Sequence, residues 1–218
     1  MPQYTSASDA SPQSRSGHAE GRGAYAHALL FTGHMIDRAD RDKPRFPAWA
    51  EARTRKAIRE AIGAVTWTHP GSTIALAGGA SGGDLLFHEC CNDLGIPTRV
   101  LLAMPPDEFE ATSVAPAGPV WVDRFHALLN RLGPDRTHVM ESSDGLLEGA
   151  TENIWQRANL WMIEEATAIA GEQALLALWD GNAGDGPGGT EHFLQVARQS
   201  GIHVLPVISM QTLVDPEC

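Results

Sequence analysis

The sequence contains few cysteines, few basic residues and no long hydrophobic run. Its 218 residues include three cysteines, of which Cys90 and Cys91 are adjacent and Cys218 is the last residue. An odd number with this spacing does not form a disulfide framework, so the sequence predicts a protein of the reducing cytoplasm. No apolar run approaches the roughly 20 residues that span a bilayer, and the N-terminus lacks the apolar core of a signal peptide. We therefore expect a cytoplasmic protein with no membrane partner.

Basic residues are scarce, because 27 acidic residues stand against 16 lysines and arginines and give a formal net charge of -11. Such a balance disfavours non-specific binding to nucleic acid, whose phosphates are repelled by an acidic surface. We expect no nucleic-acid partner. A local basic pocket for a small anionic ligand remains compatible with this charge.

Motifs for a metal site or a nucleophile are also missing. The run His88-Glu89-Cys90-Cys91 contains residue types that bind metals, but neighbours on a helix point in different directions and no second cluster has matching spacing. A buried cysteine pair is the better interpretation. The sequence lacks the GxSxG motif as well, and we expect no metal site and no resident cofactor.

Apolar and amphipathic segments alternate along the chain between two expected tails, a disordered one at residues 1–24 and a C-terminal one at 211–218. Apolar runs predict strands near residues 25–31, 73–77, 98–103, 137–140, 174–179 and 202–208. Amphipathic periodicity predicts helices near residues 49–65, 85–94, 120–132 and 191–200, a long helix that Thr151 caps, and a loop over 105–119. This alternation predicts an α/β fold, a single Rossmann-like three-layer domain over residues 25–210 with a mostly parallel sheet flanked by helices.

Four segments rich in glycine, proline or polar residues follow predicted strands, at residues 33–38, 78–84, 105–113 and 180–190. In a parallel sheet with right-handed crossovers, the carboxyl ends of the strands meet at one edge. Ligands bind at that edge, near the point where the strand order reverses. We therefore expect these four segments to converge on one site.

The most informative stretch is residues 73–89, where a buried strand, four glycines and a helix start follow one another. Glycine allows positive φ and close approach of a ligand, and the free N–H groups of a first helical turn favour an anion. Gly78, Gly79, Gly82 and Gly83 match neither the P-loop nor the GxGxxG fingerprint. A phosphate-binding turn and a tight turn without ligand therefore both remain open.

Two glycine-rich motifs resemble the SLOG superfamily, which comprises Rossmann-like domains related to the "lonely guy" (lysine-decarboxylase-like) phosphoribohydrolases and to sensor modules for nucleotide-derived ligands. These motifs are Gly-Gly-Ala-Ser-Gly-Gly-Asp at residues 78–84 and Gly-Pro-Gly-Gly-Thr-Glu at residues 186–191. Further pieces similar to bacterial proteins of this type are residues 31–37, 105–109 and 179–181 and Asn159, so the resemblance covers about residues 25–208. The resemblance implies that both glycine motifs bind phosphate or ribose.

The second motif departs from the phosphoribohydrolase pattern PGGxGTxxE, in which the glutamate lies three residues after the threonine. Here Glu191 follows Thr190 directly, and Phe193 stands at the position of that glutamate. The motif therefore implies ligand binding more strongly than catalysis.

The candidate ligand-binding residues come from the motifs and from the segments expected beside them. Arg38, with Arg45 nearby, can neutralise a phosphate or be a solvated surface residue. Asp84 can accept from a ribose hydroxyl or favour the helix start. Asn159 can reach a base or ribose, or satisfy a buried backbone group, and His34 can donate a hydrogen bond or be structural. The complete set is Gly33, His34, Arg38, Gly78, Gly79, Ser81, Gly82, Gly83, Asp84, Pro105, Asn159, Gly188, Gly189 and Thr190.

Glu191 and Asp180 are the candidate catalytic residues, since a carboxylate can stabilise an oxocarbenium-like state and activate water. The alternatives are a first-turn acid for Glu191 and a turn-forming residue for Asp180.

Three functional hypotheses follow. The first is a sensor or signalling module that binds a nucleotide or nucleotide-derived ligand, such as an ADP-ribose-like or NAD-like molecule or a nucleoside phosphate. The second is an N-glycosidic-bond hydrolase acting on a nucleotide or NAD. The third is a structural or interaction module without a ligand. A homo-oligomer is compatible with each.

Overall fold

The fold centres on a seven-stranded parallel sheet in a computed structural model that describes residues 23–66, 71–141, 153–183 and 188–215. The strands are β1 (Tyr25–Gly33), β2 (Thr73–Ala77), β3 (Thr98–Leu102), β4 (Thr137–Val139), β5 (Ala170–Trp179), β6 (His203–Val204) and β7 (Ile208–Ser209). Their order is β4-β3-β2-β1-β5-β6, and β7 also pairs with β5. All these pairings are parallel.

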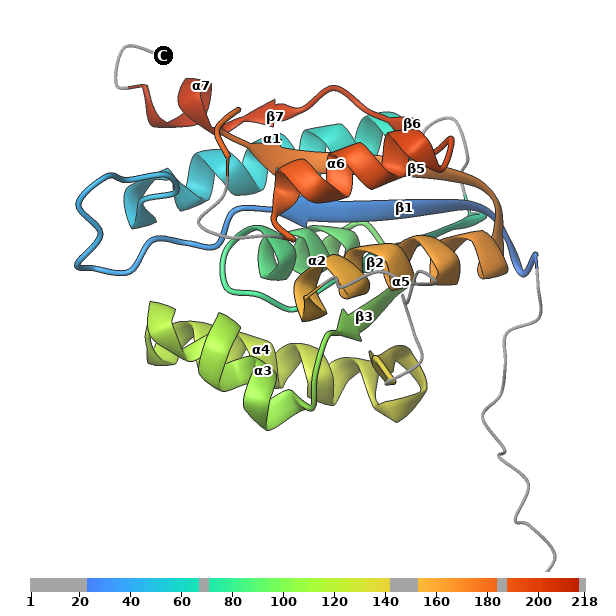
Figure 1. The fold of residues 1–218 in the computed structure, drawn as a ribbon, viewed down its shortest axis with the longest axis horizontal. Coiled ribbons are helices and arrows are strands. Elements are labelled where there is room, and N and C mark those ends of the chain that lie inside the picture. Colours follow the sequence, from blue (N-terminus) through green and yellow to red (C-terminus); the bar gives the residue numbers. More distant parts are fainter. Residues whose placement is uncertain (1–22, 67–70, 142–152, 184–187, 216–218) are drawn as a thin grey trace, which may run out of the picture.

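The strand order reverses beside β1. The chain adds β2, β3 and β4 on one side of β1, and it then adds β5 on the other side. In Figure 1, β1 is the long blue strand between β5 and β2. Such a reversal is the place where open α/β sheets bind ligands at the carboxyl ends of their strands. The sheet order confirms the predicted Rossmann-like α/β fold.

Helices flank the sheet on both faces. They are α1 (Glu51–Thr66), α2 (Gly83–Asp93), α3 (Pro106–Ser113), α4 (Pro119–Leu132), α5 (Ile154–Ile169), α6 (Thr190–Gln199) and α7 (Met210–Val214). Successive strand residues point to opposite faces, so Leu29 and Phe31 pack with α1, α2 and α4, while Ala28 and Leu30 pack with α5 and α6. Because β1 is buried on both faces, its sequence is a continuous apolar run rather than an alternating one.

One helix lies where the sequence predicts a loop over residues 105–119, so that loop prediction is wrong. α3 begins with Pro106, and Asp107 and Glu108 lie in its first turn. Proline is tolerated there because the N–H that it lacks would have no intrahelical partner, and acids favour the positive end of the helix. The paired prolines therefore start a helix three residues after β3 ends.

The start of α5 also differs from the prediction, because the N-cap is Asn153 and not Thr151, which lies outside the described residues. Asn153 caps α5: its side-chain oxygen accepts from the N–H groups of Trp155 and Gln156 at 3.0 and 2.9 Å. The Gln156 side chain accepts in return from the Asn153 N–H at 3.1 Å. This capping box orients the first turn of α5.

The C-terminal part of the chain is more divided than predicted. The single strand expected at residues 202–208 is two short strands, β6 and β7, with Pro206 between them. The segment expected as a tail begins inside α7, whose Met210 is buried against the core. Residues 1–22 of the expected N-terminal tail lie outside the described residues.

Cys90 and Cys91 lie on α2, where both are free and buried, as predicted. Within the described ranges, no group of three or more His, Cys, Asp or Glu residues is arranged to hold a metal ion. Within the same ranges, no helix has the length and apolar character to cross a bilayer.

The backbone that leaves β1 lies directly against the start of α2. Met35 forms an isolated antiparallel bridge with Gly82, and the Ile36 N–H donates to the Ser81 carbonyl at 3.1 Å. Gly82 has a φ of 96°, and a Cβ added to it would lie 2.3 Å from the Ile36 nitrogen. Only glycine satisfies both conditions. Gly82 therefore holds residues 34–36 against α2.

We expect Gly82→Ala to lower the free energy of unfolding by more than about 2 kcal/mol, because positive-φ strain and a backbone clash act together. Gly95→Ala is the matched control, since Gly95 also has positive φ (70°) but no atom within 4 Å of an added Cβ. We expect the control to cost only about 1 kcal/mol. Urea denaturation measures both, and equal losses would contradict the assigned role of Gly82.

Candidate functional site

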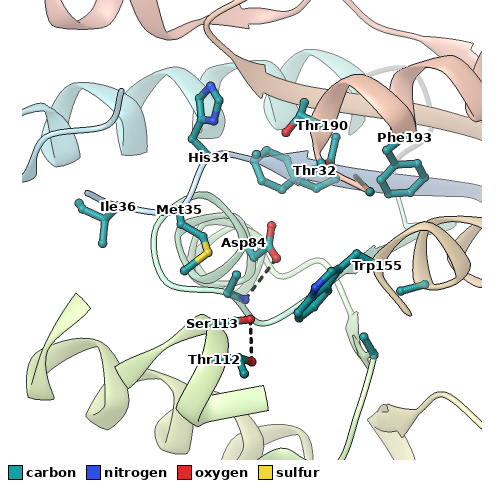
Figure 2. Close-up of a pocket in the computed structure, with 18 of the residues that line it drawn as sticks. Thr32, His34, Met35, Ile36, Asp84, Thr112, Ser113, Trp155, Thr190 and Phe193 are labelled. Carbon is teal, nitrogen blue, oxygen red and sulfur yellow. Dashed lines mark hydrogen bonds between the residues drawn. The ribbon is translucent and has the colours of Figure 1, made fainter. Parts of the chain in front are cut away.

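A cavity of about 580 Å³ lies at the carboxyl-terminal edge of the sheet, beside the reversal between β1 and β5. Its walls come from the segments that follow β1, β2 and β3, from α3 and α5, and from the start of α6 (Figure 2). The four segments predicted to converge therefore all contribute to one cavity.

The cavity lining includes nine of the predicted ligand-binding residues, namely Gly33, His34, Arg38, Gly78, Asp84, Asn159, Gly188, Gly189 and Thr190. Seven other predicted residues are described but are not part of the lining, namely Gly79, Ser81, Gly82, Gly83, Pro105, Asp180 and Glu191. Glu191 is exposed on the first turn of α6. Asp180 is buried at the end of β5, behind the cavity wall.

The turn before α2 uses several of its N–H groups in bonds within the chain. The Gly83 N–H donates to the His34 carbonyl at 3.0 Å, and the Ser81 N–H donates to the Ser113 carbonyl at 2.9 Å. The Ala80 N–H donates to Asp84 Oδ2 at 3.2 Å. These donors are engaged by the protein itself, as expected of a packed turn more than of a phosphate loop.

The start of α6 is arranged differently. Its N-cap residue is Gly189, which provides no side-chain cap, and Gly188, Gly189 and Thr190 all line the cavity. The first N–H groups of a helix lack intrahelical partners and carry the positive end of the helix dipole. Both predicted anion sites contribute to the cavity lining, but this one presents the start of its helix, at Gly189 and Thr190, without a side-chain cap.

Asn159 holds the turn before α6 in place. Its Nδ2 donates to the Gly188 carbonyl at 2.8 Å and lies 3.0 Å from Nδ1 of His192. Gly188 has a φ of 89°, and a Cβ there would lie 2.4 Å from Cβ of Trp155. Asn159 therefore satisfies a partly buried backbone carbonyl and fixes the turn against α5, and its predicted contact with a base or ribose stays a prediction.

Arg45 joins the segment that follows β1 to the end of β5. Its Nε donates to Asp180 Oδ2 at 2.9 Å and its Nη2 donates to Oδ1 at 3.1 Å, and both side chains are largely buried. Asp37 accepts from the backbone N–H groups of Arg45 and Phe46 at 2.8 and 2.9 Å. Because bidentate pairs have fixed geometry, residues 34–46 are held firmly beside the cavity.

The Asp180 carboxylate is fully engaged. Burial would raise the pKa of Asp180, but hydrogen bonds from Arg45 and Asn182 outweigh it and hold the pKa well below its ordinary value. His34 Nε2 accepts from the Asp180 N–H at 3.0 Å, so the neutral ring carries its proton on Nδ1. Burial, together with the positive charge of Arg45, lowers the pKa of His34 and favours this neutral form.

Cationic side chains also line the cavity from the segment after β1. Arg38 is mostly exposed, with its Nε 3.5 Å from Asp40 Oδ1. Arg41 is less exposed and lies 3.4 Å from Asp37 Oδ1. Arginines in the lining of a cavity attract and contact anionic ligands.

The opposite wall is aromatic, a feature that the predicted residue set does not include. Trp155 is partly exposed to the cavity and packs edge-on against Phe109 of α3, with ring centroids 6.1 Å apart. Figure 2 shows the Trp155 ring beside Asp84 and below Phe193. The nearest signal in the sequence is Asn159, which lies one turn further along α5.

Asp84 lies inside the cavity, at the start of α2, between Met35 and Trp155 (Figure 2). Its side chain accepts one hydrogen bond, from the Ala80 N–H, and the described residues supply it with no cation. Burial therefore raises the pKa of Asp84 to about 7, and the Ala80 bond opposes the shift only in part. A carboxylate in this position titrates near neutral pH.

We expect Asp84→Asn to stabilise the protein, increasingly so as pH rises. A carboxyl whose folded pKa is about 7 binds its proton more tightly than in the unfolded chain, so the wild type loses stability as pH rises from about 4 to about 7. The amide does not titrate. Calorimetry should show that the difference in Tm between variant and wild type grows by at least about 3 °C between pH 5 and pH 8.

Asp180→Asn is the opposite control, because the paired Asp180 contributes stability above its unfolded pKa and loses it only in acid. We expect Asp180→Asn to lower Tm at both pH values. A difference in Tm between Asp84→Asn and wild type that does not change with pH would contradict the raised pKa of Asp84.

Comparisons with known proteins add little to the evidence that the strand order gives for the fold. No family model matches the chain, and no curated protein matches it. Among solved structures, the chain is similar to the X-ray structure of DNA processing protein A (DprA) from Streptococcus pneumoniae, with a TM-score of 0.31 and 10% sequence identity. The similarity covers 88% of this chain and 61% of the pneumococcal chain. The Rossmann-like fold is established by the order and direction of the strands themselves.

Proposed function

We propose that this protein binds a nucleotide or nucleotide-derived ligand, such as an ADP-ribose-like or NAD-like molecule or a nucleoside phosphate, and acts as a sensor or signalling module. One observation carries the proposal: the uncapped start of α6 opens into a cavity that also contains arginine and tryptophan side chains. A phosphate and an aromatic base are the two parts of a nucleotide that these groups recognise.

The phosphate end of the ligand is assigned to the start of α6. The Thr190 hydroxyl and the first N–H groups of the helix supply donors there, and Arg38 and Arg41 supply positive charge. The base is assigned to the face of Trp155, where stacking tolerates different bases. The volume of about 580 Å³ suits one ligand of this size.

The SLOG resemblance supports the same proposal, because its second glycine motif includes Gly188, Gly189 and Thr190, which line the cavity. The geometry gives less support to a hydrolase built on Glu191 and Asp180. Glu191 is exposed outside the lining, and Asp180 is engaged by Arg45. The cytoplasmic location, the homo-oligomer and the lack of nucleic-acid or membrane partners stay predictions.

Titration calorimetry against AMP, ADP, ATP, NAD and ADP-ribose tests the proposal. We expect at least one of them to bind, and Arg38→Ala to weaken that binding by roughly three- to tenfold, because a charge-assisted contact to phosphate is lost. This loss of affinity should be smaller at high salt, because Arg38 is exposed and its charge is screened.

Arg198→Ala is the matched control, because it removes the same charge at the far end of α6, outside the cavity lining. We expect this control to leave affinity within about twofold of wild type. Lack of binding to every probe at millimolar concentration would remove the proposal, and equal losses in the two variants would remove the assigned role of Arg38.

A further inference from the structure

Asp84 differs from the other carboxylates beside the cavity. Asp180 accepts two hydrogen bonds from Arg45, and Asp37 accepts from two backbone N–H groups. Among the described residues, Asp84 accepts one hydrogen bond, from the Ala80 N–H to Oδ2. The side chain is only partly buried and its Oδ1 is not among the buried atoms without a partner, so this oxygen is accessible to donors of a ligand in the cavity.

The position of Asp84 is fixed by the turn that precedes it. A Cβ added to Gly78 would lie 2.6 Å from Asp84 Oδ2, so the absence of a side chain at Gly78 creates the space that this oxygen occupies. The Ala80 N–H bond holds the same oxygen at 3.2 Å. The turn therefore places the carboxylate in the cavity instead of leaving it in solvent, as a first-turn acid normally would be.

The surroundings restrict which donor can reach this carboxylate. Arg38, Arg41 and Arg45 line the same cavity and outnumber the two lining carboxylates, Asp37 and Asp84, so they disfavour a cationic ligand. The ligand must therefore be anionic or neutral as a whole and still bring hydrogen-bond donors to Asp84. Vicinal hydroxyls are neutral, and two of them can donate to one carboxylate.

We propose that Asp84 recognises the 2′- and 3′-hydroxyls of a ribose, so that the site selects ribonucleotide-type ligands over their deoxy counterparts. This inference rests on the proposed function, and it adds the sugar to the ligand class. The ribose lies over Asp84, between a phosphate at Thr190 and a base at Trp155, three residues that Figure 2 shows around one space.

Calorimetric titration of ADP, GDP, CDP and UDP, each beside its 2′,3′-dideoxy counterpart, tests this inference. We expect the wild-type protein to bind its best ribonucleotide at least about tenfold more tightly than the dideoxy form, because hydrogen bonds to a charged acceptor are lost. We expect Asp84→Asn to be at least as stable as wild type. In this variant the ratio of ribonucleotide affinity to dideoxynucleotide affinity should fall to about threefold or less. Arg198→Ala should retain the full ratio.

The outcomes separate this inference from the proposed function. Binding with equal affinity for ribo and dideoxy forms overturns the role of Asp84 and leaves nucleotide binding standing. A ribose preference that persists in Asp84→Asn also overturns it, since another group must then read the hydroxyls. Lack of binding by any of the eight probes removes this inference, whereas the nucleotide proposal falls only if AMP, ATP, NAD and ADP-ribose also fail to bind.

Discussion

The structure depends on the contact between the chain that leaves β1 and the glycine turn that starts α2. At Gly82 the two backbones are so close that a side chain would overlap the Ile36 nitrogen. This contact places residues 34–36 on one side of the cavity. It also engages backbone groups of the turn, because the Gly83 N–H is bonded to the His34 carbonyl. A motif that resembles a phosphate loop therefore acts, in large part, as a packing surface.

Two polar contacts position the remaining walls. Arg45 holds residues 34–46 against Asp180 at the end of β5, and Asn159 holds the Gly188 turn against α5. Both contacts join segments that lie far apart in the chain and meet only at the reversal of the strand order. They are largely buried, so each is strong only because its donors and acceptors are matched. The cavity is consequently bordered by fixed backbone on both sides.

Asp84 stands apart from this well-paired framework. Neighbouring carboxylates accept two or more hydrogen bonds, whereas within the described residues Asp84 accepts one and has a raised pKa of about 7. Its Oδ1 is not among the buried atoms without a partner, so a ligand in the cavity can supply donors to it. The position of the Asp84 carboxylate in the cavity therefore both lowers the stability of the protein as pH rises and allows the proposed recognition of a ribose. The aromatic face of Trp155 on the same cavity is consistent with this view.

The sequence by itself determined the alternation of strands and helices, the burial of Cys90 and Cys91, and the four segments that meet at one edge of the sheet. Those features follow from local apolar periodicity, from glycine and proline, and from the geometry of parallel sheets. Only the tertiary structure decided which glycine motif uses its N–H groups within the chain, that α3 replaces a loop, and that Asp180 is paired with an arginine while no described cation pairs with Asp84. These outcomes depend on distances between residues far apart in the chain, such as Arg45 and Asp180, and no local pattern encodes them.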